Sequence, residues 1–392
     1  MNNVFIVCNH VADTVKESRS IISDSPAASR KVEGLANLLK SFSTFVTVLS
    51  YGRGRTAGSS KLFYPSIKKK DLRINYFYAP FIPIKIINYV ISNLAIIIFL
   101  STCRRGERNI VLFYNRSFYY FPVLICGMLL KFDLYLDLED GELELGAPYL
   151  SQKIKKIWLR CFDKICHRGV ILANTHLVDS TIIKSQIVYY GIIDASKAAV
   201  KDLSVLNVLF SGSLERDTGS ALFCDMLKYF ERNHSSLHEK IRFFVTGKGE
   251  GLKQIESCAR QARNNGVSVE VLGAVPQDRY IEILRRSSVG LSLKLSSGVY
   301  SQSTFPSKVI EYAEYGLVVC STEISDVRKL FGCGAARFLE VETPASICAE
   351  LEWLWQNRQN IPCISKKAIE HLEVGLSYKK NKKALERLFK IT

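Results

Sequence analysis

A short run late in the chain combines the residue types that bind a phosphate group. The letters FPSK place Pro306, Ser307 and Lys308 directly before a stretch that reads as a helix. The first N–H groups of a helix have no partner inside it and lie at its positive end, so those of Ser307 and Lys308 would be free for an anion. Pro306 suits the first turn, where no N–H is needed. By helical spacing Glu311 would face the same ligand, and a carboxylate suits the diol of a sugar.

Two turns that follow apolar segments could bring backbone N–H groups to the same anion. The first is the run LNVLFSGSLERDTG, in which Gly212 and Ser213 form the turn and Arg216 offers a planar fork of donors. The second is IRFFVTGKGEG, whose glycines, starting at Gly247, allow a close backbone approach. Taken singly, each feature is more often structural, because caps, surface cations and such turns are common. Together and in this order they outline a diphosphate site.

An acidic run in the first half is the most ambiguous feature. The letters LYLDLEDGELELG place Asp137, Glu139 and Asp140 at the end of an expected strand. A carboxylate there could orient or deprotonate a hydroxyl of a substrate. A solvated loop rich in acids explains the run equally well, and both interpretations stay open. A metal site is the weaker interpretation, because helix ends and cations already offer positive charge for a diphosphate.

An α/β fold would position these residues. Short β-rich apolar runs alternate with longer amphipathic stretches through all 392 residues, which is typical of parallel sheets covered by helices. A helix is expected over 29–40, where four apolar residues recur on one face: Val32, Leu35, Ala36 and Leu39. The expected strands are 4–8, 45–50, 74–78, 110–114, 134–137 and 170–173 in the first half, and 206–211, 241–246, 267–272, 289–293 and 317–321 in the second.

The length of 392 residues favours two domains, and a polar stretch without strong periodicity, GIIDASKAAVKDLS, separates the two series of strands. We place the boundary inside it, so that residues 1–198 form one domain and residues 199–376 form the other. Residues 377–392 read as a basic terminal helix, which could simply pack on the second domain. Ligands of such sheets bind beyond the carboxyl ends of the strands, so a cleft between the domains is the expected site.

The composition is that of a packed globular protein, with 47% hydrophobic and 23% charged residues, and it excludes collagen-like and wholly disordered chains. Eleven cysteines, an odd number without a CxxC pair, suit free thiols in a reducing compartment and no structural zinc. The net charge is +16, and residues 1–130 hold 17 Lys and Arg against 6 Asp and Glu. This excess suits nucleic acid, an anionic membrane, an acidic substrate or a merely solvated surface.

The most apolar stretch is FIPIKIINYVISNLAIIIFL, residues 81–100. Proline, lysine and asparagine interrupt it, and its longest uninterrupted apolar run is far short of the roughly 20 residues that a membrane span requires. We therefore expect a buried or interfacial helix. Basic clusters flank it, which suits a helix lying against anionic lipid, and we favour this monotopic attachment over a core helix. The N-terminus, MNNVFIVCNH, has no basic flank or cleavage site and reads as a first strand rather than a signal peptide.

The order of four motifs resembles a known family. SGS followed by Arg216, then FFVTGKGEG, VLGAVPQDRYIEILRRSSVGLSL and FPSKVIEYAEYGLVVCST look like the donor half of family 4 glycosyltransferases, over about residues 205–325. The resemblance implies a GT-B fold of two Rossmann-like domains facing across a cleft, with an acceptor bound by residues 1–198 and a nucleotide-sugar donor by residues 199–376. It further implies transfer with retention, no metal or other cofactor, and a terminal helix, 377–392, that returns to the first domain.

The resemblance also implies roles for single residues. Glu311 matches the glutamate that holds the nucleotide ribose, and the N–H groups of Ser307 and Lys308 match the donor-phosphate contacts. Arg216 is a looser match to the phosphate-binding cation. Where the family has a first glutamate, eight positions earlier, this sequence has Ser303.

Two further departures concern the first domain. The family's glycine-rich loop after the first strand is absent, although small residues precede Arg30 and Lys31 at about the same place. No histidine matches the family's active-site histidine, and Asp137, Glu139 or Asp140 could take its place.

The sequence therefore predicts a retaining, metal-independent, hexosyltransferase-like enzyme of the bacterial surface-polysaccharide type. Expected partners are a nucleotide sugar, a glycan or lipid-linked acceptor and an anionic membrane surface, with the protein peripheral on the inner, cytoplasmic face of the plasma membrane; nucleic acid is not expected. Two alternatives remain: a nucleotide-sugar epimerase of GT-B architecture and a non-catalytic membrane-surface binding protein. The candidate catalytic residues are Asp140, Glu139, Lys308 and Arg216, and the candidate donor-binding residues are Gly212, Ser213, Gly247, Ser303, Pro306, Ser307, Lys308 and Glu311.

Overall fold

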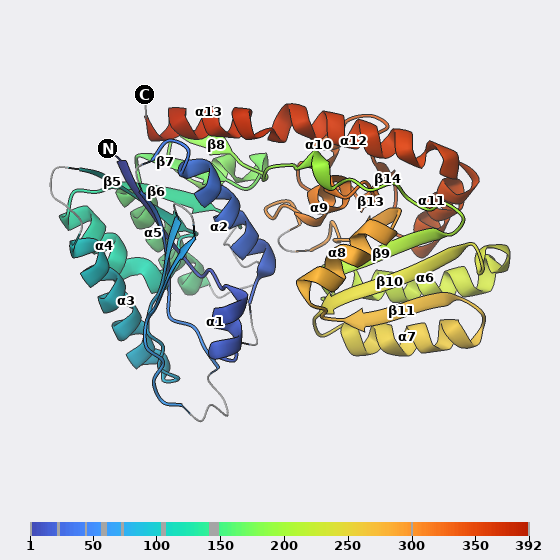
Figure 1. The fold of residues 1–392 in the computed structure, drawn as a ribbon, viewed down its shortest axis with the longest axis horizontal. Helices are drawn as coiled ribbons and strands as arrows, with labels where there is room; N and C mark the ends of the chain where they lie inside the picture. Colours follow the sequence, from blue (N-terminus) through green and yellow to red (C-terminus); the bar gives the residue numbers. More distant parts are fainter. Residues whose placement is uncertain are drawn as a thin grey trace. The chain divides into compact units, whose positions relative to one another are not determined.

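The protein, seen here as a computed structural model, is an α/β protein of two compact units (Figure 1). Unit 1 comprises Met1–Gly191 and Tyr378–Thr392, and unit 2 comprises Ile192–Ser377. The residues that the structure describes are 2–21, 24–43, 45–55, 61–71, 74–102, 107–140, 149–298 and 301–390. The predicted α/β fold class, with one mainly parallel sheet in each half, is confirmed.

The described residues of unit 1 form an eight-stranded sheet in the order β3-β4-β2-β1-β5-β6-β7-β8. Every neighbouring pair is parallel except β3 and β4, which pair antiparallel at one edge. The strands are β1 (Asn2–Cys8), β2 (Phe45–Ser50), β3 (Ile67–Asp71), β4 (Ile74–Tyr78), β5 (Arg108–Tyr114), β6 (Asp133–Leu138), β7 (Gly169–Leu172) and β8 (Gln186–Val188).

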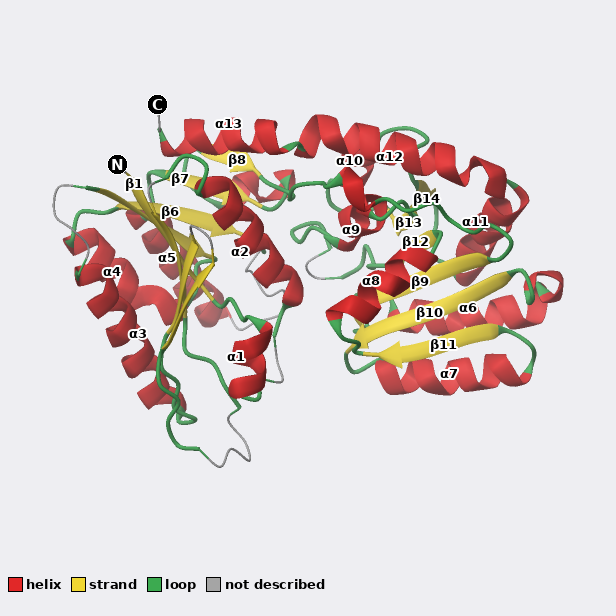
Figure 2. Ribbon diagram, in the orientation of Figure 1, coloured by secondary structure: helices red, strands yellow, loops and turns green. Residues whose placement is uncertain are grey.

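Helices cover both faces of this sheet, as parallel crossovers require. One face carries α2 (Pro26–Leu39) and α13 (Tyr378–Phe389), which pack on each other, and the other carries α3 (Lys85–Ser101), α4 (Phe121–Leu129) and α5 (Tyr149–Ile165) (Figure 2). Short helices also follow three strands: α1 (Asp13–Ser18) and the 3₁₀ turns η1 (Phe118–Tyr120) and η2 (Thr175–Ser180).

The described residues of unit 2 form a six-stranded parallel sheet in the order β11-β10-β9-β12-β13-β14. Its strands are β9 (Leu206–Ser213), β10 (Ile241–Lys248), β11 (Ser268–Gly273), β12 (Val289–Ser292), β13 (Val318–Thr322) and β14 (Arg337–Leu339). Its helices are α6 (Ser220–Asn233), α7 (Leu252–Asn264), α8 (Gln277–Arg286), α9 (Lys308–Glu314), α10 (Val327–Phe331), α11 (Pro344–Gln356) and α12 (Ile361–Leu376).

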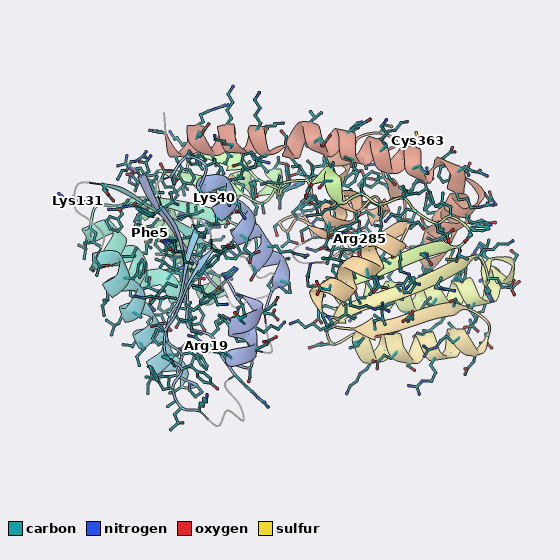
Figure 3. All side chains as sticks on the ribbon, viewed as in Figure 1. Phe5, Arg19, Lys40, Lys131, Arg285 and Cys363 are labelled. Carbon is teal, nitrogen blue, oxygen red and sulfur yellow. The ribbon has the colours of Figure 1, made fainter. Side chains whose placement is uncertain are left out.

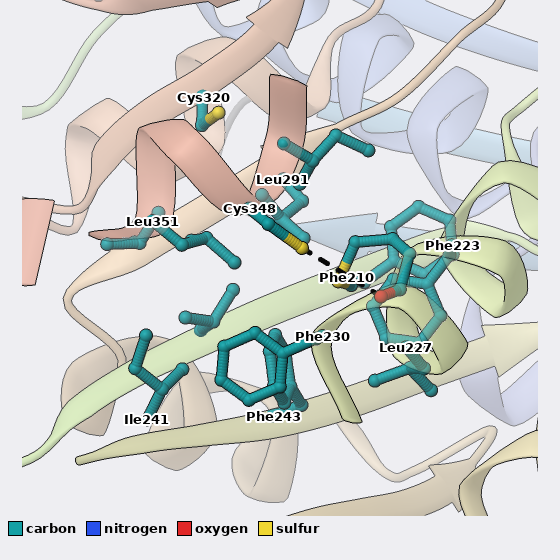
Figure 4. Close-up of a cluster of buried hydrophobic side chains, with 14 of the residues drawn as sticks. Phe210, Phe223, Leu227, Phe230, Ile241, Phe243, Leu291, Cys320, Cys348 and Leu351 are labelled. Atoms are coloured by element: carbon teal, nitrogen blue, oxygen red, sulfur yellow. Dashed lines mark hydrogen bonds between the residues drawn. The ribbon is translucent and has the colours of Figure 1, made fainter. Parts of the chain in front are cut away.

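The core of unit 2 lies between the sheet and helices α6, α7 and α11 (Figure 4). Phe223 and Phe230 of α6 are fully buried, and the ring of Phe230 meets that of Phe243 on β10 edge-on at 5.3 Å. Cys348 of α11 enters the same cluster and donates to the carbonyl of Met226 at 3.9 Å. The ten cysteines that the structure describes are all free thiols, and five of them are buried.

The apolar periodicities place most elements within a few residues of their observed bounds. The predicted helix over 29–40 is α2, and its four predicted inward residues are buried, namely Val32, Leu35, Ala36 and Leu39. This helix starts earlier because Pro26 occupies its first turn and the Ser25 hydroxyl accepts the N–H of Ala28. The sequence does not predict three of the observed strands, namely β3, β8 and β14. Each lies at a sheet edge, and β3 reads IKKKD, so it lacks the apolar pattern of a central strand.

The units divide between Gly191 and Ile192, whereas the boundary predicted from composition lies between residues 198 and 199. The intervening residues belong to unit 2 because they are tied to it. The N–H of Ile193 donates to Leu376 at 3.4 Å, and that of Asp194 donates to the Glu314 carboxylate at 2.9 Å. Lys197 completes this anchor with an ion pair to Glu314 at 3.0 Å.

Residues 85–100 of the apolar stretch lie in the helix α3, of which one side is buried and the other exposed. Within the described part of the chain, no helix has both the length and the hydropathy that crossing a membrane requires.

The last helix, α13, belongs to unit 1 through its buried face. Phe389 is fully buried, and its ring meets that of Tyr135 on β6 at 4.5 Å, edge-on. The carbonyl of Gly191 accepts the side-chain amide of Asn381 at 3.1 Å, which fixes the start of the helix. The basic terminal helix expected from the sequence therefore lies on β7, β8 and α2 of unit 1.

We predict that Phe389→Ala releases α13 from unit 1. Truncation of a buried phenylalanine typically costs about 3–5 kcal/mol, and the stability of this docked helix depends on such contacts. Hydrogen exchange should show faster exchange of the amides of α13, while Lys383→Ala, at an exposed position of the same helix, should leave it unchanged. Equal protection of α13 in both variants would contradict this account.

Candidate functional site

Two glycines at the carboxyl ends of neighbouring strands form the floor of the candidate site in unit 2. Gly212 on β9 pairs with Gly247 on β10, and their φ angles are +123° and +138°. A Cβ atom on Gly247 would lie 1.9 Å from the Gly212 carbonyl oxygen, so this close pairing requires glycine. A Cβ atom on Gly212 would lie 3.4 Å from Cε of Lys308, which shows that the Lys308 side chain lies over this floor.

Lys308 and Glu311 form an ion pair beside the glycines. The Nζ of Lys308 lies 2.6 Å from Oε2 of Glu311, and both side chains are mostly buried. The predicted common face of these two residues is therefore confirmed by their contact. In this arrangement a cation for phosphate and a carboxylate for a sugar hydroxyl lie one helical turn apart.

A tyrosine that sequence reasoning missed completes the pair. The Tyr280 hydroxyl on α8 accepts from Lys308 Nζ at 2.8 Å and donates to Glu311 at 2.9 Å. Lys308 Nζ also lies 4.5 Å from the centre of the Tyr280 ring. Burial, together with the charge of Glu311, raises the pKa of Tyr280 well above its ordinary value, so the hydroxyl keeps its proton.

Behind this triad lies a buried row of hydroxyl groups. Ser211 Oγ is 2.9 Å from the Tyr280 hydroxyl and 3.0 Å from the Tyr312 hydroxyl. Because the Tyr280 proton goes to Glu311, the Ser211 hydroxyl donates to Tyr280. Tyr312 in turn accepts the N–H of Ser211 at 3.1 Å. This row fixes the orientation of Tyr280, and no local sequence signal distinguishes its residues from ordinary core positions.

The start of α9 differs from the prediction. The helix begins at Lys308 with Ser307 as its N-cap, so Pro306 precedes the first turn instead of occupying it. The N–H of Ser307 donates to the Phe305 carbonyl at 3.0 Å, so the prediction that it is free for an anion is wrong. The cause is the tight turn before the helix, which satisfies this donor locally. The predicted left-handed cap at Gly316 is confirmed by its φ of +79°.

The remaining donor-site candidates surround the triad along the chain. Arg216 is exposed in the turn that joins β9 to α6, and Ser213 is exposed at the end of β9 just before that turn. This turn is tied to the loop before α9, because the N–H of Leu295 donates to the Asp217 carbonyl at 3.0 Å. Ser303 is half-buried in the last turn of that loop. The loop predicted to set donor specificity, residues 296–304, includes two positions, 299 and 300, that lie outside the described residues.

The acidic run of unit 1 forms a charge cluster at the end of β6. Asp137 is buried, and its carboxylate lies 2.7 Å from Nζ of Lys31 on α2. The same Nζ is in direct contact with the Glu139 carboxylate. Asp137 and Glu139 are thus paired with a lysine, so a simple solvated loop does not describe them. Asp140 is exposed, and the rest of the run, residues 141–144, lies outside the described residues.

In this cluster the ammonium group of Lys31 pairs with the carboxylates of both Asp137 and Glu139. Burial raises the pKa of Asp137, and the charge and hydrogen bond of Lys31 offset only part of that effect. Asn115 holds the backbone next to the cluster: its N–H donates to the Asp137 carbonyl and its side-chain oxygen accepts the N–H of Glu139, both at 2.7 Å. The sequence offered Lys31 only as a cation near the first strand, and the fold brings it to β6.

No group of three or more His, Cys, Asp or Glu side chains among the described residues could hold a metal ion.

The fold of both units matches solved glycosyltransferase structures over nearly the whole chain. Sucrose-phosphate synthase from Thermosynechococcus elongatus superimposes with a TM-score of 0.69 at 10% identity, covering 100% of this chain and 98% of that one. The Anabaena protein HepE in complex with UDP gives 0.68 at 10% identity, with 100% of both chains covered. A UDP-forming α,α-trehalose-phosphate synthase from Burkholderia xenovorans gives 0.67 at 9% identity, covering 100% and 99%. The protein therefore has the GT-B fold with two Rossmann-like domains.

The sequence of unit 2 matches a known family model. Residues 194–371 match the model of the family described as Glycosyl transferases group 1, and they include the glycine floor and the triad. Most of unit 2 is therefore similar in sequence to group 1 glycosyltransferases, and the fold of the chain is that of GT-B glycosyltransferases. No curated protein matches the sequence significantly.

Lys201 supports α8, the helix that carries Tyr280, and makes the stability of unit 2 pH-dependent. Its Nζ donates to the last carbonyls of α8, those of Leu284 and Arg285, both at 3.0 Å. Burial lowers the pKa of Lys201 from 10.5 to about 8. Between these two values the unfolded chain binds the proton that the folded chain has released, so the free energy of unfolding rises with pH.

We predict that the stability difference between wild type and Lys201→Met changes with pH in this window. Methionine keeps most of the apolar stem but cannot titrate, so wild type should gain stability relative to the variant from about pH 8 to about pH 10.5. Urea unfolding of both proteins at several pH values measures the difference, and other groups cancel in the comparison. A difference independent of pH would show that Lys201 titrates normally.

Proposed function

We propose that the protein is a retaining glycosyltransferase that moves a sugar from a nucleoside diphosphate sugar to a glycan or lipid-linked acceptor in cell-surface polysaccharide synthesis. The observation that carries the proposal is the Lys308–Glu311 ion pair at 2.6 Å, held over the glycine floor in the part of unit 2 that is similar to group 1 glycosyltransferases. Phosphate and ribose are adjacent in such a donor, and a cation and a carboxylate are adjacent in this pair.

Donor binding would exchange the partners of this ion pair. The diphosphate takes the Lys308 ammonium group, and the ribose hydroxyls donate to the Glu311 carboxylate. Tyr280 keeps both side chains in place during the exchange, because it contacts each of them. We propose that Gly212, Ser213 and Gly247 let the backbone approach the diphosphate, while Pro306, Ser307 and Ser303 line the side toward the donor sugar.

The chemistry would rest on charge stabilisation. Negative charge builds on the leaving diphosphate as the glycosidic bond breaks, and Lys308 neutralises it at a fixed position. Arg216, exposed on the neighbouring turn, can supply a second cation through its planar donors. These two side chains would do the work that a metal ion does elsewhere, which is why we propose a metal-independent reaction.

Unit 1 would bind the acceptor. We propose that Glu139 and Asp140 orient or deprotonate the acceptor hydroxyl, because they follow β6 at the sheet edge where ligands of parallel sheets bind. Lys31 and Asp137 then act as positioning residues that hold Glu139. The proposal also places the enzyme as a peripheral protein on the anionic inner face of the plasma membrane, in the cytoplasm.

The similar structures support a uridine donor as the first to test. HepE was solved in complex with UDP, and the Burkholderia xenovorans synthase is UDP-forming. The sequence identity to both is low, so they guide the choice of ligand rather than determine it.

We expect a thermal-shift panel of nucleoside diphosphates and their sugars to identify the donor. A ligand present at a hundred times its Kd adds about 2.7 kcal/mol of stability, a shift of several degrees. Glu311→Gln should lose most of the shift for nucleoside diphosphates. A panel without any specific hit would overturn the proposed donor class.

We predict that Lys308→Ala lowers kcat more than it raises KM for the donor. A charge contact that strengthens as the leaving group forms typically contributes a factor of about 10²–10³ in kcat. Initial rates at varied donor concentration separate the two constants. An unchanged kcat would reject a transition-state role for Lys308. Donor consumption without acceptor would instead favour an epimerase or hydrolase.

A further inference from the structure

The helix α3 of unit 1 has its apolar side toward solvent. Ile86, Val90, Leu94 and Ile98 are exposed and recur at every fourth position, so they form one outward stripe. Ile86 is 78% exposed. Large apolar side chains gathered on a surface mark a site that binds another apolar surface, because their exposure to water is unfavourable.

The buried side of the first half of this helix is polar, whereas the second half buries Ile96 and Leu100. Asn88 donates to the Gly52 carbonyl at 2.9 Å and accepts the N–H of Ile82 at 3.2 Å. Ser92 donates to the Pro80 carbonyl at 3.1 Å. These bonds tie α3 to the loops after β2 and β4 and fix its rotation about its own axis.

Neighbouring elements extend the apolar surface. The ring of Phe118 in η1 lies 5.9 Å from that of Tyr89 on α3, and Phe118 itself is exposed. At the end of α4, three successive residues are exposed, with Leu129 at 72%. We define the lipid face as the exposed apolar side chains of α3, η1, the end of α4 and the start of α5. Its members are Ile86, Ile87, Val90, Leu94, Ile98, Phe118, Tyr119, Met128, Leu129, Leu130, Ile154 and Ile157.

The charges on these elements are of one sign. The sequences of α3, η1 and α4 contain no acidic residue, and Lys85 begins α3. Lys131 lies just after the end of α4 (Figure 3). On α5 the exposed cations Lys153, Lys156 and Arg160 share one helical face with the two exposed isoleucines. The acid of α5, Asp163, is buried and paired with Arg116 at 3.2 Å.

We infer that the lipid face lies on an anionic membrane, with its apolar side chains among the acyl chains and its lysines and arginine at the headgroups. Apolar side chains surrounded by cations and free of acids fit an anionic bilayer, whereas a protein partner would need matching acids of its own. No described helix is able to span the bilayer, so the contact is interfacial. This inference rests on the membrane location proposed above and assigns that contact to one surface, which is apart from the donor site and does not depend on the identity of the donor.

The position of the lipid face suits a lipid-linked acceptor. α3 follows β4 and η1 follows β5, so the apolar surface starts at the sheet edge where the chain leaves the carboxyl ends of the strands. Glu139 and Asp140 follow β6 at that same edge. An acceptor anchored in the bilayer would reach these carboxylates without leaving the membrane surface.

Vesicle co-sedimentation of the full chain tests the inference. Vesicles of phosphatidylglycerol and phosphatidylcholine should bind the protein, and pure phosphatidylcholine vesicles should bind it at least tenfold more weakly. Ile86→Ser/Leu94→Ser should lower the partition coefficient at least tenfold, because two inserted side chains are lost. The matched control Val200→Ser/Val341→Ser removes two exposed valines of unit 2 and should leave the partition unchanged.

A second variant tests the charge. Lys153→Gln/Lys156→Gln should lower binding to anionic vesicles and reduce its dependence on salt. Equal binding of wild type and Ile86→Ser/Leu94→Ser, or no binding of wild type, would overturn the inference. A dimer in lipid-free solution that dissociates in this variant would overturn it too, since a second copy would then cover the face. An unchanged thermal shift with the donor nucleotide in all variants separates these outcomes from a failure of the proposed function.

Discussion

The close pairing of Gly212 with Gly247 is the constraint on which the candidate donor site depends. Any side chain on Gly247 would collide with the carbonyl of Gly212, and the floor that these residues form is what Lys308 lies across. Lys308 thereby comes within reach of Glu311 and Tyr280 at once. The Ser211 and Tyr312 hydroxyls continue this hydrogen-bonded network to β9, so the Tyr280 side chain is tied to the sheet.

Each unit holds a lysine and a carboxylate beyond the carboxyl edge of its sheet. In unit 2 the pair lies on one helix, one turn apart, and in unit 1 Lys31 of α2 reaches Asp137 and Glu139 at the end of β6. The charges compensate one another in the absence of substrate, so neither site holds an unpaired buried charge. A charged substrate can then replace one partner at little cost in desolvation. Under the proposed function, this common arrangement would let unit 2 bind an anionic donor and unit 1 a hydroxyl-bearing acceptor.

The sequence predicts the parallel sheets and their order along the chain well, because central strands such as 4–8 and 110–114 are continuous apolar runs. It also predicts that Lys308 and Glu311 meet, since helical spacing alone brings them together. It cannot predict Tyr280, because this residue of α8 contacts α9 about 30 positions further along the chain, and no local pattern joins the two. It misses the bond from Ser307 to Phe305 for a related reason: the conformation of the turn before a helix is not set by its composition. Which side of α3 faces outward is likewise set by tertiary contacts, among them the hydrogen bonds of its buried Asn88 and Ser92.

The most direct measurement is a crystal structure of the protein with the nucleoside diphosphate that stabilises it most. The account predicts a phosphate oxygen within hydrogen-bonding distance of Lys308 Nζ above Gly212, and the ribose hydroxyls on the Glu311 carboxylate, with Tyr280 still bound to Glu311. A nucleotide bound at another surface, or one whose ribose leaves Glu311 paired only with Lys308, would contradict the account.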